Sequence, residues 1–222
     1  LVAFVVEDSE SGLYVAKYAA DGTFEGVDWA LETDIANGER VDRPSIEALP
    51  GGGYAVTYGT GAGSPIEVIL SDADTGGSLQ TVEIEDGFFV NYDYPMDEKF
   101  RVATLDADKI VVVVSNDSGI DLAIVKKSGE TWIRNDSQSV QDFSSPDGQV
   151  PSVAALDDGN FVVTWQEYDA GSSRVSIYSR VFDSDGAPVT GEMAVDVEFD
   201  NDEYDADVAA IDGGYAHPRD AF

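Results

Sequence analysis

A pattern that occurs four times along the chain restricts the fold more than any other feature. Pro44–Tyr58 contains an apolar strand, a glycine turn and a second apolar strand, and Pro151–Trp165 repeats that order around an Asp-Gly turn. Arg101–Val114 is a more divergent copy, and Asp207–Tyr215 begins a fourth. The aliphatic residues at the matching position, which are 56, 51 and 55 residues apart, are Leu49, Leu105, Leu156 and Ile211. A period of about 50 residues suits a unit of four short strands.

The second half of each unit also repeats. Tyr14–Gly22, Ile66–Gly76 and Tyr178–Gly186 each consist of an apolar strand that ends in a turn of Asp and Gly. Glycine supplies the positive φ that tight hairpins need. Another strand follows each time, near residues 29–31, 79–84, 132–134 and 193–197. Because apolar residues alternate in short runs and helical patterns are nearly absent, the sequence predicts an all-β fold.

The two ends of the chain indicate how the repeats close. Residues 1–6 match the second strand of a unit, with Phe4 at the position of Trp165, and residues 206–216 supply a first strand. Overlap of the two ends would complete one blade and remove exposed sheet edges. We therefore predict a single domain over residues 1–222, a β-propeller of four blades with four antiparallel strands each. Its approximate repeats are 1–42, 43–99, 100–149 and 150–205, followed by a closing strand at 206–216. The alternative is an excerpt of a larger propeller or array.

The best-preserved copy carries a resemblance to a known class of repeats. The motif of Pro151–Trp165, followed by Tyr178–Gly186, resembles repeats of large secreted bacterial proteins that are associated with RTX (hemolysin-type) calcium-binding segments. The match is close in residues 151–197, fair in 43–84 and 1–31, and weak in 100–134. The resemblance implies a secreted or cell-surface protein with an adhesion or matrix role and with calcium nearby. It implies no enzymatic activity, since such repeats are scaffolds.

Charge and composition narrow the classes of function. The chain has 44 acidic and 12 basic residues, a formal net charge of −32, so phosphate backbones and anionic membrane surfaces are repelled and we expect no nucleic-acid partner. No run approaches the roughly 20 apolar residues that cross a bilayer, which predicts no membrane insertion. The chain has no cysteine, which excludes disulfides and Cys-based zinc sites. It opens at Leu1 in an apolar run that we interpret as a strand, so we expect a piece of a longer protein.

Clustered carboxylates suggest a metal site before the last strand. The candidate ligands in this connection are Asp196, Glu198, Asp200, Asp202 and Asp205. Such density repels itself unless it is solvated or neutralised, and Ca²⁺ prefers hard oxygen ligands. The sequence therefore predicts either a calcium site or a solvated acidic surface. We interpret the Asp-rich hairpin at Asp183–Gly186 as a plain turn.

Catalytic chemistry has few candidates. The one histidine, His217, lies in a tail outside the repeat, so a triad or an imidazole metal site has no second member. Glu47 departs from the repeat, because it stands where the related strands have Ala103, Ala154 and Ala209. It is the candidate catalytic carboxylate of a glycoside hydrolase or lyase, or else a solvated residue of a central channel. Arg101 is a second departure, at the position of Ser45 and Ser152.

An aromatic connection interrupts the repeat at residues 87–95. Its candidate ligand-binding residues are Phe88, Phe89, Tyr92 and Tyr94, interleaved with Asn and Asp. Such a segment suits stacking on a sugar or contact with a protein, or it packs under a long loop.

These features favour a non-catalytic binding, adhesion or structural module of an exported bacterial protein, stabilised by Ca²⁺. Its expected partner is a glycan or a protein surface, and two chains could pair into a larger ring. The alternatives are a carbohydrate-active enzyme that uses channel carboxylates and a lectin.

Overall fold

The computed structural model describes residues 1–6, 12–32, 42–50, 52–59, 66–71, 79–85, 100–116, 119–135, 138–142, 150–169, 174–195 and 207–216. The regular elements of these residues are all β-strands, which confirms the all-β prediction. No helix among them is long and apolar enough to span a membrane. The chain divides into two compact units, Leu1–Tyr94 with Lys126–Arg134 and Pro95–Val125 with Asn135–Phe222.

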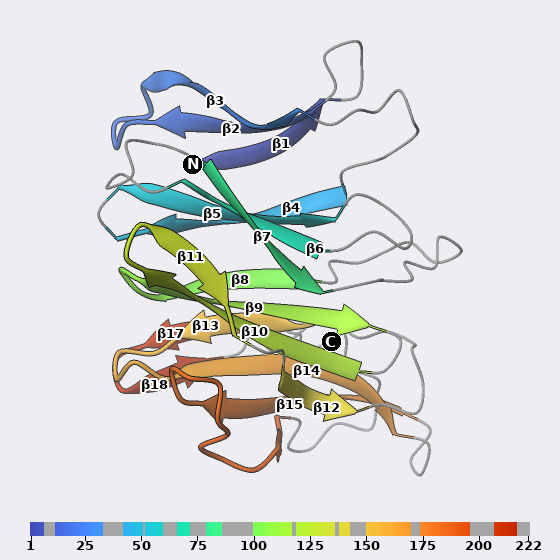
Figure 1. The fold of residues 1–222 in the computed structure, drawn as a ribbon. Helices are drawn as coiled ribbons and strands as arrows, with labels where there is room; N and C mark the ends of the chain where they lie inside the picture. The colour runs from blue at the N-terminus through green and yellow to red at the C-terminus, as the bar shows by residue number, and fades with distance from the viewer. Residues whose placement is uncertain are drawn as a thin grey trace. The chain divides into compact units, whose positions relative to one another are not determined.

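The first unit contains two antiparallel sheets whose strands follow one another in space as they do in sequence (Figure 1). The strands of the first sheet are β1 (Val2–Val6), β2 (Gly12–Tyr18) and β3 (Phe24–Glu32). The strands of the second sheet are β4 (Asp42–Leu49), β5 (Gly53–Gly59), β6 (Ile66–Ser71) and β7 (Leu79–Glu85). The short strand β11 (Thr131–Arg134) lies along β7, where Gln80 accepts a hydrogen bond from the backbone of Trp132 at 2.9 Å.

The facing sides of these two sheets form the core of the first unit. Residues paired directly across antiparallel strands share a face, so Leu13 and Val15 of β2 lie on one face with their partners on β1. This face packs on fully or almost fully buried residues of the second sheet, Tyr54, Val56, Tyr58 and Ile69. Lys17 adds a cation–π contact, with Nζ 5.5 Å from the centre of the Tyr54 ring.

The second unit contains the third sheet apart from Lys126–Arg134, which the first unit includes, together with the fourth sheet and a short hairpin. The third sheet runs in the order β11-β10-β9-β8, with β12 on β10. Its remaining strands are β8 (Phe100–Asp106), β9 (Lys109–Asn116), β10 (Gly119–Ser128) and β12 (Gln138–Asp142). The strands of the fourth sheet are β13 (Ser152–Ala155), β14 (Phe161–Asp169), β15 (Arg174–Phe182) and β16 (Met193–Ala194). The hairpin consists of β17 (Ala209–Ile211) and β18 (Gly214–Ala216), which pair with each other.

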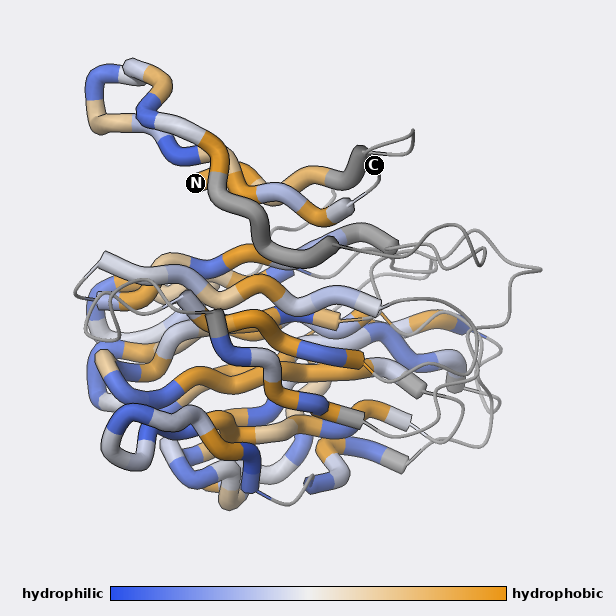
Figure 2. Tube along the Cα trace, turned by 45° about the horizontal axis from the view of Figure 1, so that its top comes forward, coloured by the Kyte–Doolittle hydropathy of each residue, from blue (hydrophilic) through white to orange (hydrophobic). Residues whose placement is uncertain are grey.

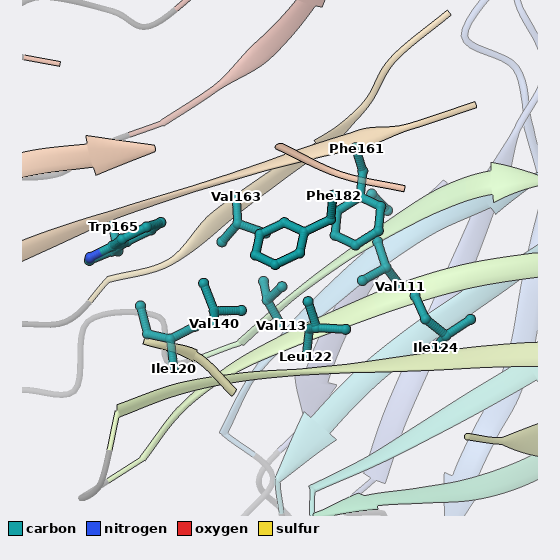
Figure 3. Packing of buried hydrophobic residues seen from close by; sticks show 11 residues of the cluster. Val111, Val113, Ile120, Leu122, Ile124, Val140, Phe161, Val163, Trp165 and Phe182 are labelled. Carbon is teal, nitrogen blue, oxygen red and sulfur yellow. The ribbon is translucent and has the colours of Figure 1, made fainter. Parts of the chain in front are cut away.

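The core of the second unit lies between the third and fourth sheets. Phe161, Val163 and Trp165 project from β14 toward β9, β10 and β12, and Phe182 of β15 stacks on Phe161 at 5.4 Å between ring centres (Figure 3). The side chains that meet them are Val111, Val113, Ile120, Leu122, Ile124 and Val140. The opposite face of β14 is packed as well, because Val162 contacts Val208 beside the β17–β18 hairpin. Hydrophobic residues thus fill the strands, while the hairpin turns are hydrophilic (Figure 2).

An ion pair and two hydrogen bonds connect two hairpin turns of the second unit. Lys109 Nζ lies 3.0 Å from the Asp185 carboxylate and donates to Ser184 Oγ at 3.2 Å. Gln138 Nε2 donates to the Asp185 carbonyl at 3.1 Å. These contacts tie the β8–β9 turn and β12 to the β15–β16 turn, at the rim of the hydrophobic core.

The first and fourth sheets pair equivalent aromatic residues in the same register. Trp165 pairs with Tyr178 across β14 and β15, and their rings stack at 6.2 Å. Phe4 pairs with Tyr14 across β1 and β2, and these rings stack at 5.5 Å. The β1–β2 pair of the first sheet therefore has the register of the β14–β15 pair of the fourth sheet.

Candidate functional site

One position at the start of the first strand can be matched in all four repeats, and its side chain differs among them. Counting back from the anchoring aliphatic residue, the residues at this position are Ser45, Arg101, Ser152 and Asp207. Two of them are serine, whereas the other two carry opposite charges. Arg101 is half-buried and Asp207 is exposed. A repeat scaffold does not require either charge, because the serine copies fold without them.

Three of the four positions meet in the second unit. Ser152 Oγ donates to Asp207 Oδ1 at 2.6 Å, and the backbone N–H of Val208 donates to the same oxygen at 2.9 Å. Burial lowers the pKa of Arg101, and the charge of Asp207 acts against that shift. The site therefore combines a partly buried guanidinium, a carboxylate held by two donors and a serine hydroxyl.

A buried hydroxyl adjoins this group. Thr164 pairs directly with Ser152 on one side and with Ser179 on the other, so the three hydroxyls form a row across β13, β14 and β15. Thr164 is fully buried, and its hydroxyl has no hydrogen-bond partner within the described part of the chain. Polar groups that are buried in this way carry a desolvation cost, which a bound ligand or water would offset.

The chemistry of the group favours a hydroxyl-rich or acidic organic ligand over a metal ion. Arg101 would repel a cation near Asp207, and within the described ranges no three His, Cys, Asp or Glu side chains come together as a metal site. A guanidinium next to a carboxylate and hydroxyls offers both donors and acceptors, as the vicinal hydroxyls of a sugar require.

Glu47, the catalytic candidate from the sequence, lies in the first unit. It pairs with Ala55 across β4 and β5, and Ala55 pairs with Leu70, so its neighbours on that face are small or apolar. It is half-buried, and burial raises the pKa of its carboxyl group. An acid in such a setting holds its proton at higher pH than an exposed glutamate does.

The other predicted site residues lie outside the described residues. This holds for Phe88, Phe89, Tyr92 and Tyr94, for His217, and for the proposed calcium ligands Asp196, Glu198, Asp200, Asp202 and Asp205. The calcium site and the aromatic ligand site therefore stay predictions.

The turn aspartates have a structural role. Asp183 Oδ1 accepts from the backbone N–H groups of Asp185 and Ala187, at 3.0 and 2.9 Å. Asp21 accepts in the same way from Thr23 at 2.9 Å, and the hydrogen bonds to Thr23 lower its pKa. These carboxylates close Asx-type turns, which accounts for part of the acidic excess.

Sequence reasoning missed the role of Asp207. It recognised Asp207 as the start of the fourth repeat but gave it no role, although its place in the repeat matches Ser152. Comparison of all four strand starts, position by position, was the signal that could have found the group.

Comparisons with known proteins add little to this site. No protein-family model and no curated protein matches the sequence. Among solved structures, the chain is similar to the catalytic domain of a GH62 alpha-L-arabinofuranosidase from Coprinopsis cinerea, with a TM-score of 0.43 and 11% sequence identity. The similarity covers 90% of this chain and 68% of that chain. At this distance it assigns no residue and no activity to this chain.

Proposed function

We propose that the chain is a non-catalytic glycan-binding module of an exported protein, built on propeller-type blades, and that Arg101, Ser152 and Asp207 form its ligand site. The proposal rests on one observation: the two residues that depart from the repeat at its serine position are found in the same site. Arg101 and Asp207 replace serine at matching positions, and both act on the same small region around Ser152.

Partial burial of the Arg101 charge supports a binding role. A desolvated charge weakens a fold unless its partner and hydrogen bonds compensate, and a neutral serine at the same place avoids that cost. Retention of a half-buried arginine beside an exposed aspartate is therefore best explained by a ligand that uses both. Export agrees with the repeat type, with the absence of cysteine and with the acidic composition.

The test replaces Arg101 and Asp207 with serine, which is the residue that the other two repeats have at this position. Arg101→Ser and Asp207→Ser should each lower affinity for glycans at least tenfold, a loss of about 1.4 kcal/mol, while the unfolding midpoint stays the same or rises. Lys126→Ser and Glu192→Ser are controls with the same charge changes elsewhere. The measurement is a glycan-array screen followed by calorimetric titration of the best binder. Undiminished binding by both site variants would refute this site.

A second candidate function, a carbohydrate-active enzyme, is favoured by one observation, the raised pKa of Glu47. A buried carboxyl group that keeps its proton can act as a general acid toward a leaving glycosidic oxygen. In that case the chain hydrolyses aryl glycosides, and Glu47→Gln abolishes the activity while Arg101→Ser leaves hydrolysis measurable. Equal hydrolysis by the Glu47→Gln variant and the parent would exclude this role.

A further inference from the structure

The Asp207 carboxylate is held in place by two donors. The Ser152 hydroxyl and the Val208 backbone N–H both donate to its Oδ1, at 2.6 and 2.9 Å. Ser152 and Val208 are buried, whereas Asp207 itself is exposed. Hydrogen bonds to a carboxylate are charge-assisted and directional, so the group is oriented before a ligand arrives. Because both bonds engage Oδ1, a ligand would use Oδ2.

Comparison with the serine copies shows what the aspartate adds. Ser45 and Ser152 occupy the matching position in two other repeats. A serine hydroxyl can both donate to a ligand and accept from it, whereas an ionised carboxylate only accepts and carries a negative charge. Asp207 therefore contributes charge to the site, in addition to the hydrogen bonding that a serine would already supply.

Arg101 supplies the opposite charge in a different setting. Its guanidinium is half-buried and donates from Nη1 to the Phe100 carbonyl at 3.2 Å. Burial lowers the pKa of Arg101, and the charge of Asp207 raises it. The two side chains are therefore within electrostatic reach of each other, and their charges offset one another within the site.

The charge of a sugar decides how it meets this pair. A uronic acid could pair with Arg101, but its carboxylate would approach Asp207 in a chain whose net charge is −32. A protonated amino sugar is attracted by Asp207 and repelled by Arg101. A neutral sugar can donate from one hydroxyl to Asp207 and accept with another from Arg101, so it uses both groups without repulsion.

We propose that Asp207 is the specificity-determining residue of the glycan site, where its carboxylate accepts from a hydroxyl of a neutral sugar and repels uronic acids. This role rests on the glycan-binding function proposed above. Repulsion between charges at an exposed residue is screened as salt shortens the Debye length from ~10 Å at about 0.1 M to ~3 Å at about 1 M. The preference for neutral sugars is therefore largest at low ionic strength.

Calorimetric titration of the full chain with matched sugars tests the proposal. The probes are oligosaccharides of glucose, galactose and mannose, each paired with the oligomer of its own uronic acid, so that the members of a pair differ at C6 alone. In the pair that binds best, the neutral member should bind roughly tenfold more tightly or better at about 0.1 M NaCl. At about 1 M NaCl the uronic acid should gain affinity, while the affinity for the neutral member stays the same.

Asp207→Asn removes the charge and keeps an oxygen that can accept from Ser152 and Val208. In this variant the two members of the pair should bind within about threefold of each other, because the uronic acid gains affinity. Glu192→Gln is the matched control, since Glu192 is an exposed carboxylate elsewhere in the second unit, and it should keep the preference of the parent.

The outcomes separate this role from the proposed function. If the parent binds a uronic acid as tightly as its neutral counterpart, and Arg101→Ser loses both, Asp207 is not the specificity-determining residue, while glycan binding at this site stands. An unchanged preference in Asp207→Asn would overturn the proposal in the same way. Absence of binding to every probe would overturn it as well, and the proposed function would fail with it only if no other glycan of the array binds.

Discussion

Gly186 is the position where one added methyl group has the clearest predicted effect. It lies in the β15–β16 turn with φ +90°, and a Cβ atom there would stand 2.8 Å from Gln138 Nε2 and 3.0 Å from Leu122 Cδ1. Gly159, in the β13–β14 turn, has nearly the same φ, +84°, but nothing within 4 Å of its Cβ position. Both glycines follow an aspartate, so Gly159→Ala is a matched control for Gly186→Ala.

The magnitudes follow from these surroundings. The left-handed conformation alone costs an alanine about 1–2 kcal/mol, and both variants incur that cost. Gln138 must also move away from the new methyl group and give up its hydrogen bond to Asp185, worth about 1 kcal/mol. Leu122 is 1% exposed and cannot withdraw easily, which adds about 1 kcal/mol of overpacking. Gly186→Ala should therefore lose about 2 kcal/mol more than Gly159→Ala.

Equilibrium unfolding in urea, followed by tryptophan fluorescence and circular dichroism, measures this difference. Adding Gln138→Ala to Gly186→Ala should recover part of the loss, because that change removes the clashing amide. Equal losses in the two glycine variants, within about 0.5 kcal/mol, would refute the idea that the turn packs tightly on β10 and β12.

Three further predictions concern other groups. Glu47→Gln should raise the unfolding midpoint at pH 7 and leave it unchanged at about pH 3.5. Burial raises the folded-state pKa of Glu47, so its neutral form contributes stability below the unfolded-state pKa. That contribution is lost as the pH rises through the folded-state pKa. Tyr58→Phe should destabilise the first unit by about 1–2 kcal/mol in urea unfolding, because the Tyr58 hydroxyl donates to the Glu67 carboxylate on β6 and its loss leaves that partly buried acceptor without this donor. If residues 196–205 bind calcium, millimolar Ca²⁺ should raise the melting temperature relative to EDTA, while Mg²⁺ has little effect. At a hundredfold excess of Ca²⁺ over Kd, the folded state gains about 2.7 kcal/mol. Equal melting temperatures in all three solutions would refute the site.

Most of the strands and turns could be predicted from local patterns in the sequence. The alternation of Phe161, Val163 and Trp165 with smaller residues specifies a strand with one large apolar face, and the Asp-Gly pairs specify the turns. The extra strand β12 was not expected, because Gln138–Asp142 has one apolar residue, Val140, and too little alternation to signal a strand.

The candidate site depended on contacts that no local pattern records. Ser152 and Asp207 are far apart in sequence, and their hydrogen bond exists because β13 and β17 lie side by side. In the same way, Phe4 and Trp165 have equivalent places in the repeat, yet one is exposed and the other fully buried. Sequence gives the apolar face of a sheet, whereas the presence of a neighbour to cover it depends on tertiary structure.

The division of the hydrophobic core has a consequence for how the chain loses its structure. One cluster is confined to the first two sheets, and the clusters around β14 belong to the second unit. These clusters share no residue, so each unit can lose its packing without exposing the core of the other. Damage near Trp165 should therefore loosen the second unit while the first keeps its structure, so unfolding proceeds in steps.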